Sequence, residues 1–242
     1  MRLVVCLPTY EERDNIEPMV HALDETFRAS GLDDAHVLVI DDNSPDGTGA
    51  IADGLAAKHP WVQVLHRPRK QGLGPAYVAG FHRALADGAD LVVEMDCDFS
   101  HDPADVPRLV ASMQHADLVL GSRYVPGGRI ENWGPGRRAV SRLGSWYARI
   151  VLGLPFRDLT GGFKCFRRVV LEGIDLDTIS ARGYAFQIET TYRATQAGFR
   201  VAEIPIAFVD REVGGSKMTK AIVAEAVWRV PTLRFQASRR RL

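Results

Sequence analysis

Two aspartates, Asp96 and Asp98, stand two positions apart at the end of an apolar run, in the stretch VVEMDCDFSHDP (92–103). Two carboxylates held close together repel each other unless a positive charge lies between them. A hard divalent cation, Mg²⁺ or Mn²⁺, suits that position, because one or two carboxylates and the oxygens of a substrate phosphate complete its coordination. The pair therefore predicts a metal site that a phosphorylated ligand completes. The alternative is a surface turn in which an aspartate caps the next helix, a task that Asp102 can already perform.

The elements that must position this pair alternate between strands and helices. Runs rich in Val and Leu predict strands at 3–7, 36–41, 62–67, 91–96 and 117–123, with helices between them at about 14–30, 47–59, 74–87 and 103–115. This alternation predicts an α/β fold with a mostly parallel, doubly wound sheet flanked by helices. Within a strand that reaches residue 96, the two-residue period places Asp96 and Asp98 on the same side.

Three helices carry signals at their N-termini. Asp14 with Glu17 forms a capping box, and Ser44-Pro45 and Asp102-Pro103 each place a capping residue before a proline.

The second half of the chain is less regular. The Gly-, Arg- and Pro-rich segment 125–138 predicts a loop. Further elements are expected as helices near 138–152 and 183–197, a strand at 200–210 and a helical stretch at about 218–236. We expect one α/β domain over residues 1–217 and a C-terminal extension over 218–242.

The composition argues against several classes of protein. Thirty basic and thirty acidic side chains cancel, so no overall charge favours nucleic acid as a partner. Three cysteines are too few and too scattered for a disulfide framework or a zinc cluster. The N-terminus lacks a secretory pattern, and no run of about 18 apolar residues occurs. We therefore expect a cytoplasmic protein that is soluble or peripheral.

Polar segments follow four of the predicted strands, at the carboxyl ends where open parallel sheets bind ligands. They are PTYEE, DDNSPDG, DCDFS and GSRYVPGG. Asp41 could end its strand while Asp42 faces a ligand and accepts hydrogen bonds from a ribose or a base. Either carboxylate could instead form an Asx turn toward Ser44, and both interpretations stay open at this point.

A series of motifs occurs in the order found in family 2 glycosyltransferases with the GT-A fold, and the chain resembles most the dolichol- or polyprenol-phosphate mannose synthases of that family. The motifs are LPTYEERDNI, IDDNSPDGT, MDCDFSHDP, GSRYVPGG, DLTGGFKCF, GYAFQIE and FVDREVGGSK, and they span residues 7–217. The resemblance implies inverting transfer of mannose from GDP-mannose to a polyprenyl phosphate at a membrane.

The resemblance also implies roles for individual residues, carried over position by position. The nucleotide-binding residues are Pro8, Tyr10, Glu12, Ile40, Asp42 and the Cys97 backbone. The metal-side residues are Asp96, Asp98 and, where some relatives have a third ligand, Ser100. The residues at the phosphates of the donor are Arg123, Arg211 and Lys217, and those at the acceptor phosphate are Arg123, Arg137 and Ser141. For the cations, the alternative is ordinary surface salt bridging.

The expected chemistry needs these groups and no general base. GDP gathers negative charge as it leaves, and a metal ion with Arg and Lys side chains stabilises that charge. A phosphate monoester is already anionic near neutral pH, because its second pKa is about 6. We therefore expect the acceptor phosphate to attack the anomeric carbon directly and to convert α-linked mannose into a β-linked product.

The C-terminal extension is basic and amphipathic. Its apolar residues recur at roughly helical spacing, namely Val223, Val227, Val230, Leu233 and Phe235. Such a helix either lies on the cytoplasmic face of a membrane or packs on the catalytic core. Many relatives carry C-terminal transmembrane helices that this chain lacks, so we expect peripheral binding or a membrane-embedded partner subunit. Two other functions remain open: transfer from UDP-glucose, and a non-catalytic nucleotide-sugar-binding scaffold.

Overall fold

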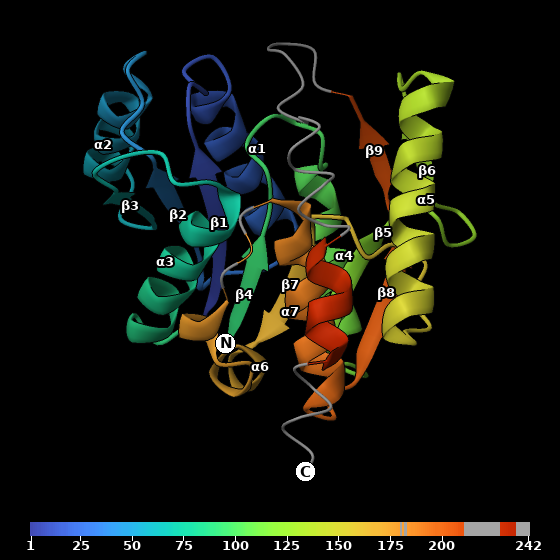
Figure 1. Cartoon of the computed structure of the whole chain (residues 1–242). Helices are drawn as coiled ribbons and strands as arrows, with labels where there is room; N and C mark the ends of the chain where they lie inside the picture. The colour runs from blue at the N-terminus through green and yellow to red at the C-terminus, as the bar shows by residue number, and fades with distance from the viewer. Residues whose placement is uncertain (180, 182, 211–227, 236–242) are drawn as a thin grey trace.

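The computed structural model describes residues 1–179, 181, 183–210 and 228–235 (Figure 1). Its centre is a seven-stranded sheet in the order β3-β2-β1-β4-β7-β5-β8. In that order the strands are β3 (Val62–His66), β2 (Ala35–Asp41), β1 (Leu3–Thr9), β4 (Leu91–Glu94), β7 (Lys164–Arg167), β5 (Leu118–Ser122) and β8 (Val201–Pro205). All neighbouring pairs are parallel except those of β7, which runs antiparallel between β4 and β5. The predicted mostly parallel sheet is confirmed.

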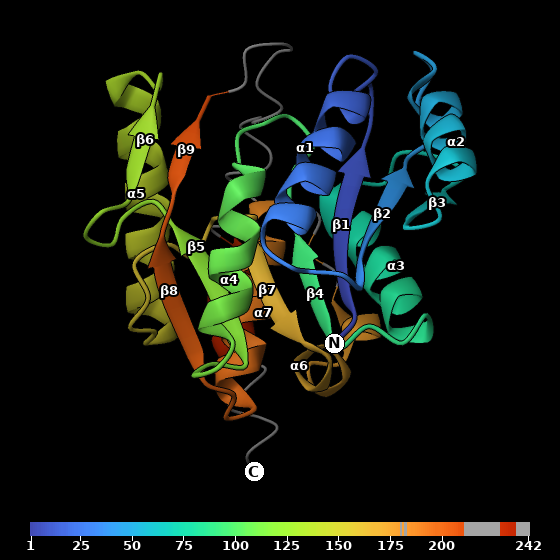
Figure 2. The ribbon, with the colours of Figure 1, turned by 180° about the vertical axis from the view of Figure 1, so that it is seen from behind.

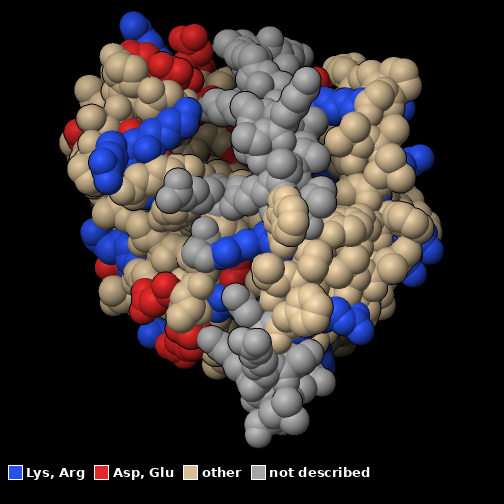
Figure 3. Space-filling view, viewed as in Figure 1, with Lys and Arg blue, Asp and Glu red and all other residues tan. Residues whose placement is uncertain are grey.

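Helices cover both faces of this sheet, as Figures 1 and 2 show from opposite sides. One face packs against α1 (Ile16–Ala29), α2 (Thr48–Lys58) and α4 (Val106–Ser112). The other packs against α3 (Leu73–Ala86), α6 (Arg168–Gly173) and α7 (Tyr184–Gln196). Along β1, Leu3, Val5 and Leu7 enter the first core while Val4 and Cys6 enter the second. Strands buried on both faces explain the near-continuous apolar runs. The face seen in Figure 3 carries charges of both signs, in keeping with the balanced composition.

The second half departs from the prediction in three places. The sequence analysis did not predict β7, which lies within the motif DLTGGFKCF. The predicted strand at 200–210 is divided at Ile206 into β8 and β9 (Ala207–Val209). A second, two-stranded sheet pairs β9 with β6 (Arg129–Glu131), so the loop prediction for 125–138 was wrong at β6. The helix that follows, α5 (Pro135–Leu152), starts earlier than expected.

The helix N-termini confirm one capping prediction and contradict two. Asp102 accepts a hydrogen bond from the Ala104 backbone N–H at 2.9 Å at the start of the 3-10 turn η1 (Pro103–Asp105). At α1 the capping position is Asn15, without a side-chain cap. At α2 it is Gly47, whose φ of 93° favours glycine. A second 3-10 turn, η2 (Leu176–Thr178), precedes α7.

The described part of the C-terminal extension, residues 228–235, is helical and lies against the core. Val230 and Leu233 are buried among residues of α5 and α7 that include Ala148, Leu152 and Ile188. This eight-residue piece therefore packs on the catalytic core, while 218–227 and 236–242 lie outside the described residues. Within the described part of the chain, no helix combines the length and the apolar content that crossing a bilayer requires.

Candidate active site

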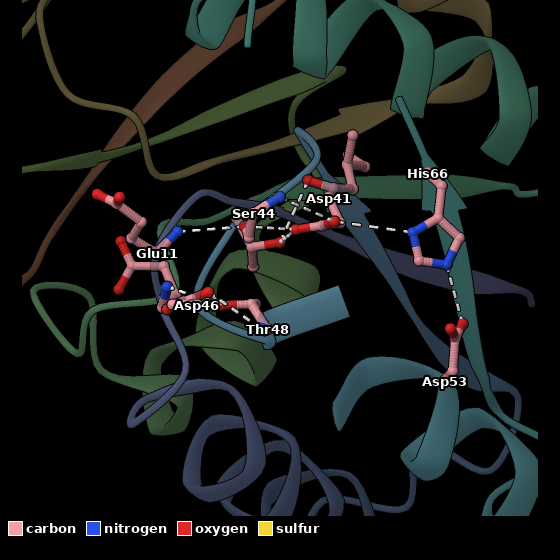
Figure 4. A network of polar contacts seen from close by, with 10 residues as sticks. Glu11, Asp41, Ser44, Asp46, Thr48, Asp53 and His66 are labelled. Atoms are coloured by element: carbon pink, nitrogen blue, oxygen red, sulfur yellow. Dashed lines mark hydrogen bonds and ion pairs between the residues drawn. The ribbon is translucent and has the colours of Figure 1, made fainter. Parts of the chain in front are cut away.

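The four polar segments lie at one edge of the sheet, because β1, β2, β4 and β5 run in the same direction. Their carboxyl ends therefore converge, as the sequence predicted. The loops after β1 and β2 are tied together by hydrogen bonds (Figure 4). The Glu11 backbone N–H donates to Ser44 Oγ at 3.2 Å, and the Glu12 backbone N–H donates to Thr48 Oγ1 at 3.1 Å.

Asp96 and Asp98 lie in a turn beyond β4. That strand ends at Glu94, so the prediction from strand alternation was wrong for this pair. The turn places Phe99 at a φ of 59° and folds back on itself. The Ser100 backbone N–H donates to Asp98 Oδ1 at 3.1 Å, and the Tyr77 hydroxyl donates to Asp96 Oδ1 at 3.4 Å. A hydrogen bond within the turn holds Asp98, and one from Tyr77 on α3 holds Asp96, so the pleat of a strand positions neither carboxylate.

His101 supports this turn and was missed by the sequence analysis. Its Nδ1 accepts the Asp96 backbone N–H at 3.2 Å. Its buried ring stacks on Phe163, with centroids 4.9 Å apart, and meets Phe208 edge-on at 5.4 Å. Burial lowers the pKa of His101 to about 4, so the ring is neutral at pH 7 and can accept that hydrogen bond. The feature of the sequence that could have identified His101 is its position in the motif MDCDFSHDP, two residues after Phe99.

The carboxylate pair fits a metal ion whose coordination a substrate completes. Across the described ranges, no cluster of three or more His, Cys, Asp or Glu side chains forms a full ligand set. His101 Nδ1 already accepts a backbone N–H, so this atom is not a third ligand. Ser100, the expected third ligand, and Cys97 are buried in the same turn. A pair of carboxylates suits Mg²⁺ or Mn²⁺, which keep positions for water and phosphate oxygens.

The two acidic residues at the end of β2, Asp41 and Asp42, make different contacts. Asp41 accepts the Ser44 backbone N–H at 3.3 Å and the Ser44 hydroxyl at 2.6 Å, so the Asx-turn interpretation holds for Asp41 (Figure 4). Asp42 forms a buried ion pair with Arg67, which the sequence analysis did not name. Burial raises the pKa of Asp42, although the charge of Arg67 opposes the shift. Asp41 is thus held by its own turn and Asp42 by Arg67, and a contact of Asp42 with a ligand stays a prediction.

The other expected nucleotide-binding residues lie around β1. Pro8 stands opposite Ile40 in the β1–β2 register. The Ile40 side chain is fully buried against α3, where a Cβ on Gly80 would lie 2.3 Å from Ile40 Cδ1. Only the Ile40 backbone can therefore meet a ligand. The ring of Tyr10 lies beneath the ammonium group of Lys70, 3.6 Å from its centroid. Lys70 is an additional cation that the sequence analysis missed.

Arg123 forms a buried, bidentate ion pair with Asp158. Its Nε and Nη2 donate to the two carboxylate oxygens at 2.7 Å each, and Nη2 also donates to Thr160 Oγ1 at 2.9 Å. Burial favours a higher pKa for Asp158, but the charge and hydrogen bonds of Arg123 outweigh burial and lower the pKa. Because both side chains are buried, the alternative of an ordinary surface salt bridge is wrong for Arg123. Asp158 opens the motif DLTGGFKCF, yet it was not named as a site residue.

The structure brings together the three residues expected at the acceptor phosphate. Trp133 contacts two of them, with the Arg123 and Arg137 guanidinium carbons 5.5 and 4.2 Å from its ring centroid. The Tyr124 hydroxyl donates to Ser141 Oγ at 2.7 Å. Among the described residues, the buried Trp133 indole N–H has no hydrogen-bond partner.

This group is continuous with the Asp96–Asp98 turn. Trp133 packs edge-on against Phe208 at 5.2 Å, and Phe208 contacts His101. Arg137 Nη1 donates to both oxygens of Asp210 at 2.7 Å. Arg211 and Lys217, the other expected donor-side cations, lie outside the described residues.

A third buried ion pair lies beneath the site and was also missed. Lys164 on β7 stands directly opposite Glu94 on β4, with Nζ 3.4 Å from Oε1. Lys164 Nζ also donates to Gln187 Oε1 at 2.6 Å and to Thr190 Oγ1 at 3.1 Å. Burial raises the pKa of Glu94 to about 7, although Lys164 opposes the shift. Because Glu94 is the last residue of β4, this pair fixes the strand from which the Asp96–Asp98 turn starts.

Lys164→Met is expected to lower the free energy of unfolding by about 3–5 kcal/mol at pH 8, because it leaves the Glu94 carboxylate buried without its cation. The pKa of Glu94 is raised on folding, so the carboxyl group stabilises the fold most below its ordinary value of 4.5 and loses this contribution as the pH rises to about 7. The loss should therefore be smaller at pH 5 than at pH 8. Urea unfolding at both pH values measures it, and an equal loss at both would contradict the expectation.

Two sequence relatives match nearly the whole chain. The undecaprenyl-phosphate mannosyltransferase of Micrococcus luteus is 48% identical over 227 residues, covering 94% of this chain and 91% of that protein. The polyprenol monophosphomannose synthase of Mycolicibacterium smegmatis is 46% identical over 231 residues, covering 95% of this chain and 85% of that protein.

Solved structures of glucosyl-3-phosphoglycerate synthase from Mycobacterium tuberculosis share the fold at 19% identity. The complex with Mn²⁺, UDP-glucose and phosphoglyceric acid has a TM-score of 0.69 and covers 97% of this chain and 80% of that one. The complex with Mg²⁺ and UDP has a TM-score of 0.71 and covers 97% and 79%. The expected GT-A fold is thereby confirmed. The family model "Glycosyl transferase family 2" matches residues 4–175. This chain belongs to glycosyl transferase family 2.

Proposed function

We propose that this chain transfers mannose from GDP-mannose to a polyprenyl phosphate, with inversion, at the surface of a membrane. The main observation in support of the proposal is that the two groups of residues expected to bind phosphates lie next to each other. The Asp96–Asp98 turn reaches Trp133 through His101 and Phe208, and Trp133 contacts both Arg123 and Arg137. A donor diphosphate and an acceptor phosphate would thus be held side by side. The names of two relatives at 46–48% identity describe mannosyl transfer to such lipids.

On the donor side, Asp42 and the loops after β1 and β2 would hold the nucleoside. Asp96 and Asp98 would hold Mg²⁺ or Mn²⁺, which supplies positive charge for the departing diphosphate. Arg211 and Lys217, whose positions match the family motif, would contact the same phosphates. Asp158 keeps the Arg123 guanidinium fixed in the plane of its bidentate pair, so the cation is oriented before a ligand arrives.

On the acceptor side, the lipid phosphate would displace Asp210 from Arg137. Asp210 occupies that guanidinium with both oxygens, as a phosphate would. The Trp133 indole N–H, buried and without a partner among the described residues, is a further donor for the phosphate. Held there as an anion, the phosphate attacks the anomeric carbon without a general base. We propose that the protein works peripherally on the cytoplasmic face of a membrane, alone or beside a membrane-embedded subunit.

Incubation with radiolabelled GDP-mannose, a short polyprenyl phosphate and Mg²⁺ or Mn²⁺ is expected to give a mannolipid with a β-linkage. GDP-mannose at about 100 times its Kd should also stabilise the fold by about 2.7 kcal/mol, measured as a rise in melting temperature with metal present. Transfer and stabilisation with UDP-glucose alone would instead indicate a glucosyltransferase. Stabilisation without transfer to any lipid phosphate would indicate a binding scaffold, and an α-linked product would rule out direct attack.

A further inference from the structure

His66, the last residue of β3, lies between two carboxylates beside the loops expected to hold the nucleoside (Figure 4). Its Nε2 is 2.9 Å from Asp53 Oδ1 on α2, and its Nδ1 is 3.7 Å from Asp41 Oδ2 at the end of β2. A neutral imidazole has a single N–H and can donate to only one of these carboxylates. The protonated ring carries an N–H on each nitrogen and a charge that attracts both carboxylates. The geometry therefore favours the protonated ring.

The charges around the ring also favour protonation. The hydrogen bond to Asp53 and the charges of Asp53 and Asp41 raise the pKa of His66 above its ordinary value of 6.5, although partial burial opposes the shift. Arg67, the next residue along the chain, forms its own ion pair with Asp42. The His66 side chain is 50% exposed, so its charge follows the pH of the solvent.

Asp41 connects this ring to the loops after β1 and β2. Its Oδ1 accepts the Ser44 hydroxyl at 2.6 Å, and Ser44 Oγ accepts the Glu11 backbone N–H at 3.2 Å. The first turn of α2 packs closely on the same groups, since a Cβ on Gly49 would lie 2.8 Å from Asp41 Oδ2 and 3.3 Å from His66 Cε1. One chain of contacts therefore runs from α2 through β3 and β2 to the loop after β1 (Figure 4).

We propose that His66 is a positioning residue for the donor nucleoside: its protonated ring fixes the Asx turn of Asp41 and so orders the loops after β1 and β2 before the nucleoside binds. The inference rests on the proposed function, in which these loops hold the nucleoside. Loops that are already ordered lose less conformational freedom on binding, so the affinity is higher.

The proposed role has a defined dependence on pH. When the ring loses its proton and keeps the N–H that faces Asp53, the lone pair of Nδ1 faces the Asp41 carboxylate, and the attraction that fixed this side chain is gone. Because the pKa of His66 is raised in the folded protein, its contribution is complete below pH 6.5 and is lost as the pH rises through the raised value. The affinity for the nucleoside should therefore carry a component that falls between slightly acidic and alkaline pH.

Isothermal titration calorimetry of the full chain with GDP and Mg²⁺ at pH 6.0 and pH 8.5 tests this role. His66→Gln has no charge at either pH, and it should bind GDP roughly threefold to fivefold more weakly than the wild type at pH 6.0, the size of effect expected from a half-exposed ion pair. At pH 8.5 the two proteins should bind GDP equally well. GDP and the metal ion titrate in the same way in both samples, so the ratio of the two Kd values reports on His66 alone.

His82→Gln is the matched control. His82 Nε2 lies 2.9 Å from Asp177 Oδ1 and its side chain is 47% exposed, but this pair joins α3 to η2. The variant should bind GDP as the wild type does at both pH values. Asp53→Asn keeps an acceptor beside His66 Nε2 and removes one of the two charges that favour the protonated ring, so its affinity for GDP should begin to fall at a lower pH than that of the wild type.

Hydrogen exchange of the Glu11 amide in the ligand-free protein separates this inference from the proposed function. At pH 6.0 this amide should exchange faster in His66→Gln than in the wild type, and at the wild-type rate in His82→Gln. If GDP binds neither the wild type nor any variant while the Glu11 amide responds as expected, the proposed donor is wrong and the ordering of the loops by His66 stands. Three outcomes would overturn the inference: a ratio of Kd values that is the same at both pH values, an Asp53→Asn protein with the wild-type pH profile, or an unchanged Glu11 amide in His66→Gln.

Discussion

Asp98→Asn is expected to lower kcat by about 10²- to 10³-fold while leaving the fold intact. The asparagine carbonyl can still accept the Ser100 backbone N–H, so the turn keeps its hydrogen bond. The charge that would hold a divalent cation beside the departing diphosphate is lost, and stabilisation of such developing charge commonly contributes more to catalysis than any other effect. Mannosyl transfer should be measured over a range of Mn²⁺ concentrations, where the half-maximal concentration should rise as well.

Asp102→Asn is the matched control for this substitution. Asp102 lies four residues further on, is exposed, and caps η1 through the Ala104 backbone N–H. Asparagine caps about as well as aspartate, so activity and metal requirement should both stay at wild-type values. An Asp98→Asn enzyme with unchanged kcat and unchanged metal dependence would remove the metal role from this turn, and with it the chemical basis of the proposed donor site.

Asp158→Asn is expected to lower the free energy of unfolding by about 3–5 kcal/mol, because it leaves the guanidinium of Arg123 buried without its counter-charge. For a chain of this size, the melting temperature should fall by roughly 10 °C. Both side chains are almost completely buried, so solvent cannot screen the remaining charge. Differential scanning calorimetry at pH 7 measures the loss.

Glu172→Gln provides the comparison, because it removes one partner of an exposed ion pair with the same nitrogen–oxygen distance. Glu172 lies 2.7 Å from Arg168, as Asp158 does from Arg123, but both side chains of that pair are well exposed. Exposed pairs contribute about 0–1 kcal/mol, so this variant should melt close to the wild type. Arg123→Met combined with Asp158→Leu should recover most of the loss in stability, though not activity. Equal effects of Asp158→Asn and Glu172→Gln would show that burial does not set the strength of the pair.

The parallel strands could be predicted because each has to be apolar on both faces. Residues 3–7 read as a continuous apolar run, and their side chains enter two different cores. β7 escaped prediction for a related reason. Its first residue, Lys164, is charged and buried, and only groups distant in sequence, Glu94 on β4 with Gln187 and Thr190 on α7, make that burial tolerable.

The sequence by itself determined the fold class and the sheet edge at which the four polar segments meet, since these follow from local periodicity and from the direction of parallel strands. Tertiary structure decided how the groups are held. Asp158, His101 and Trp133 come from separate segments and are linked only in the fold, through Arg123 and Phe208, which both contact Trp133. Contacts of this kind join residues that are far apart along the chain. The spacing of residues in the sequence therefore cannot predict them. The same packing decided which face of α5 stays exposed.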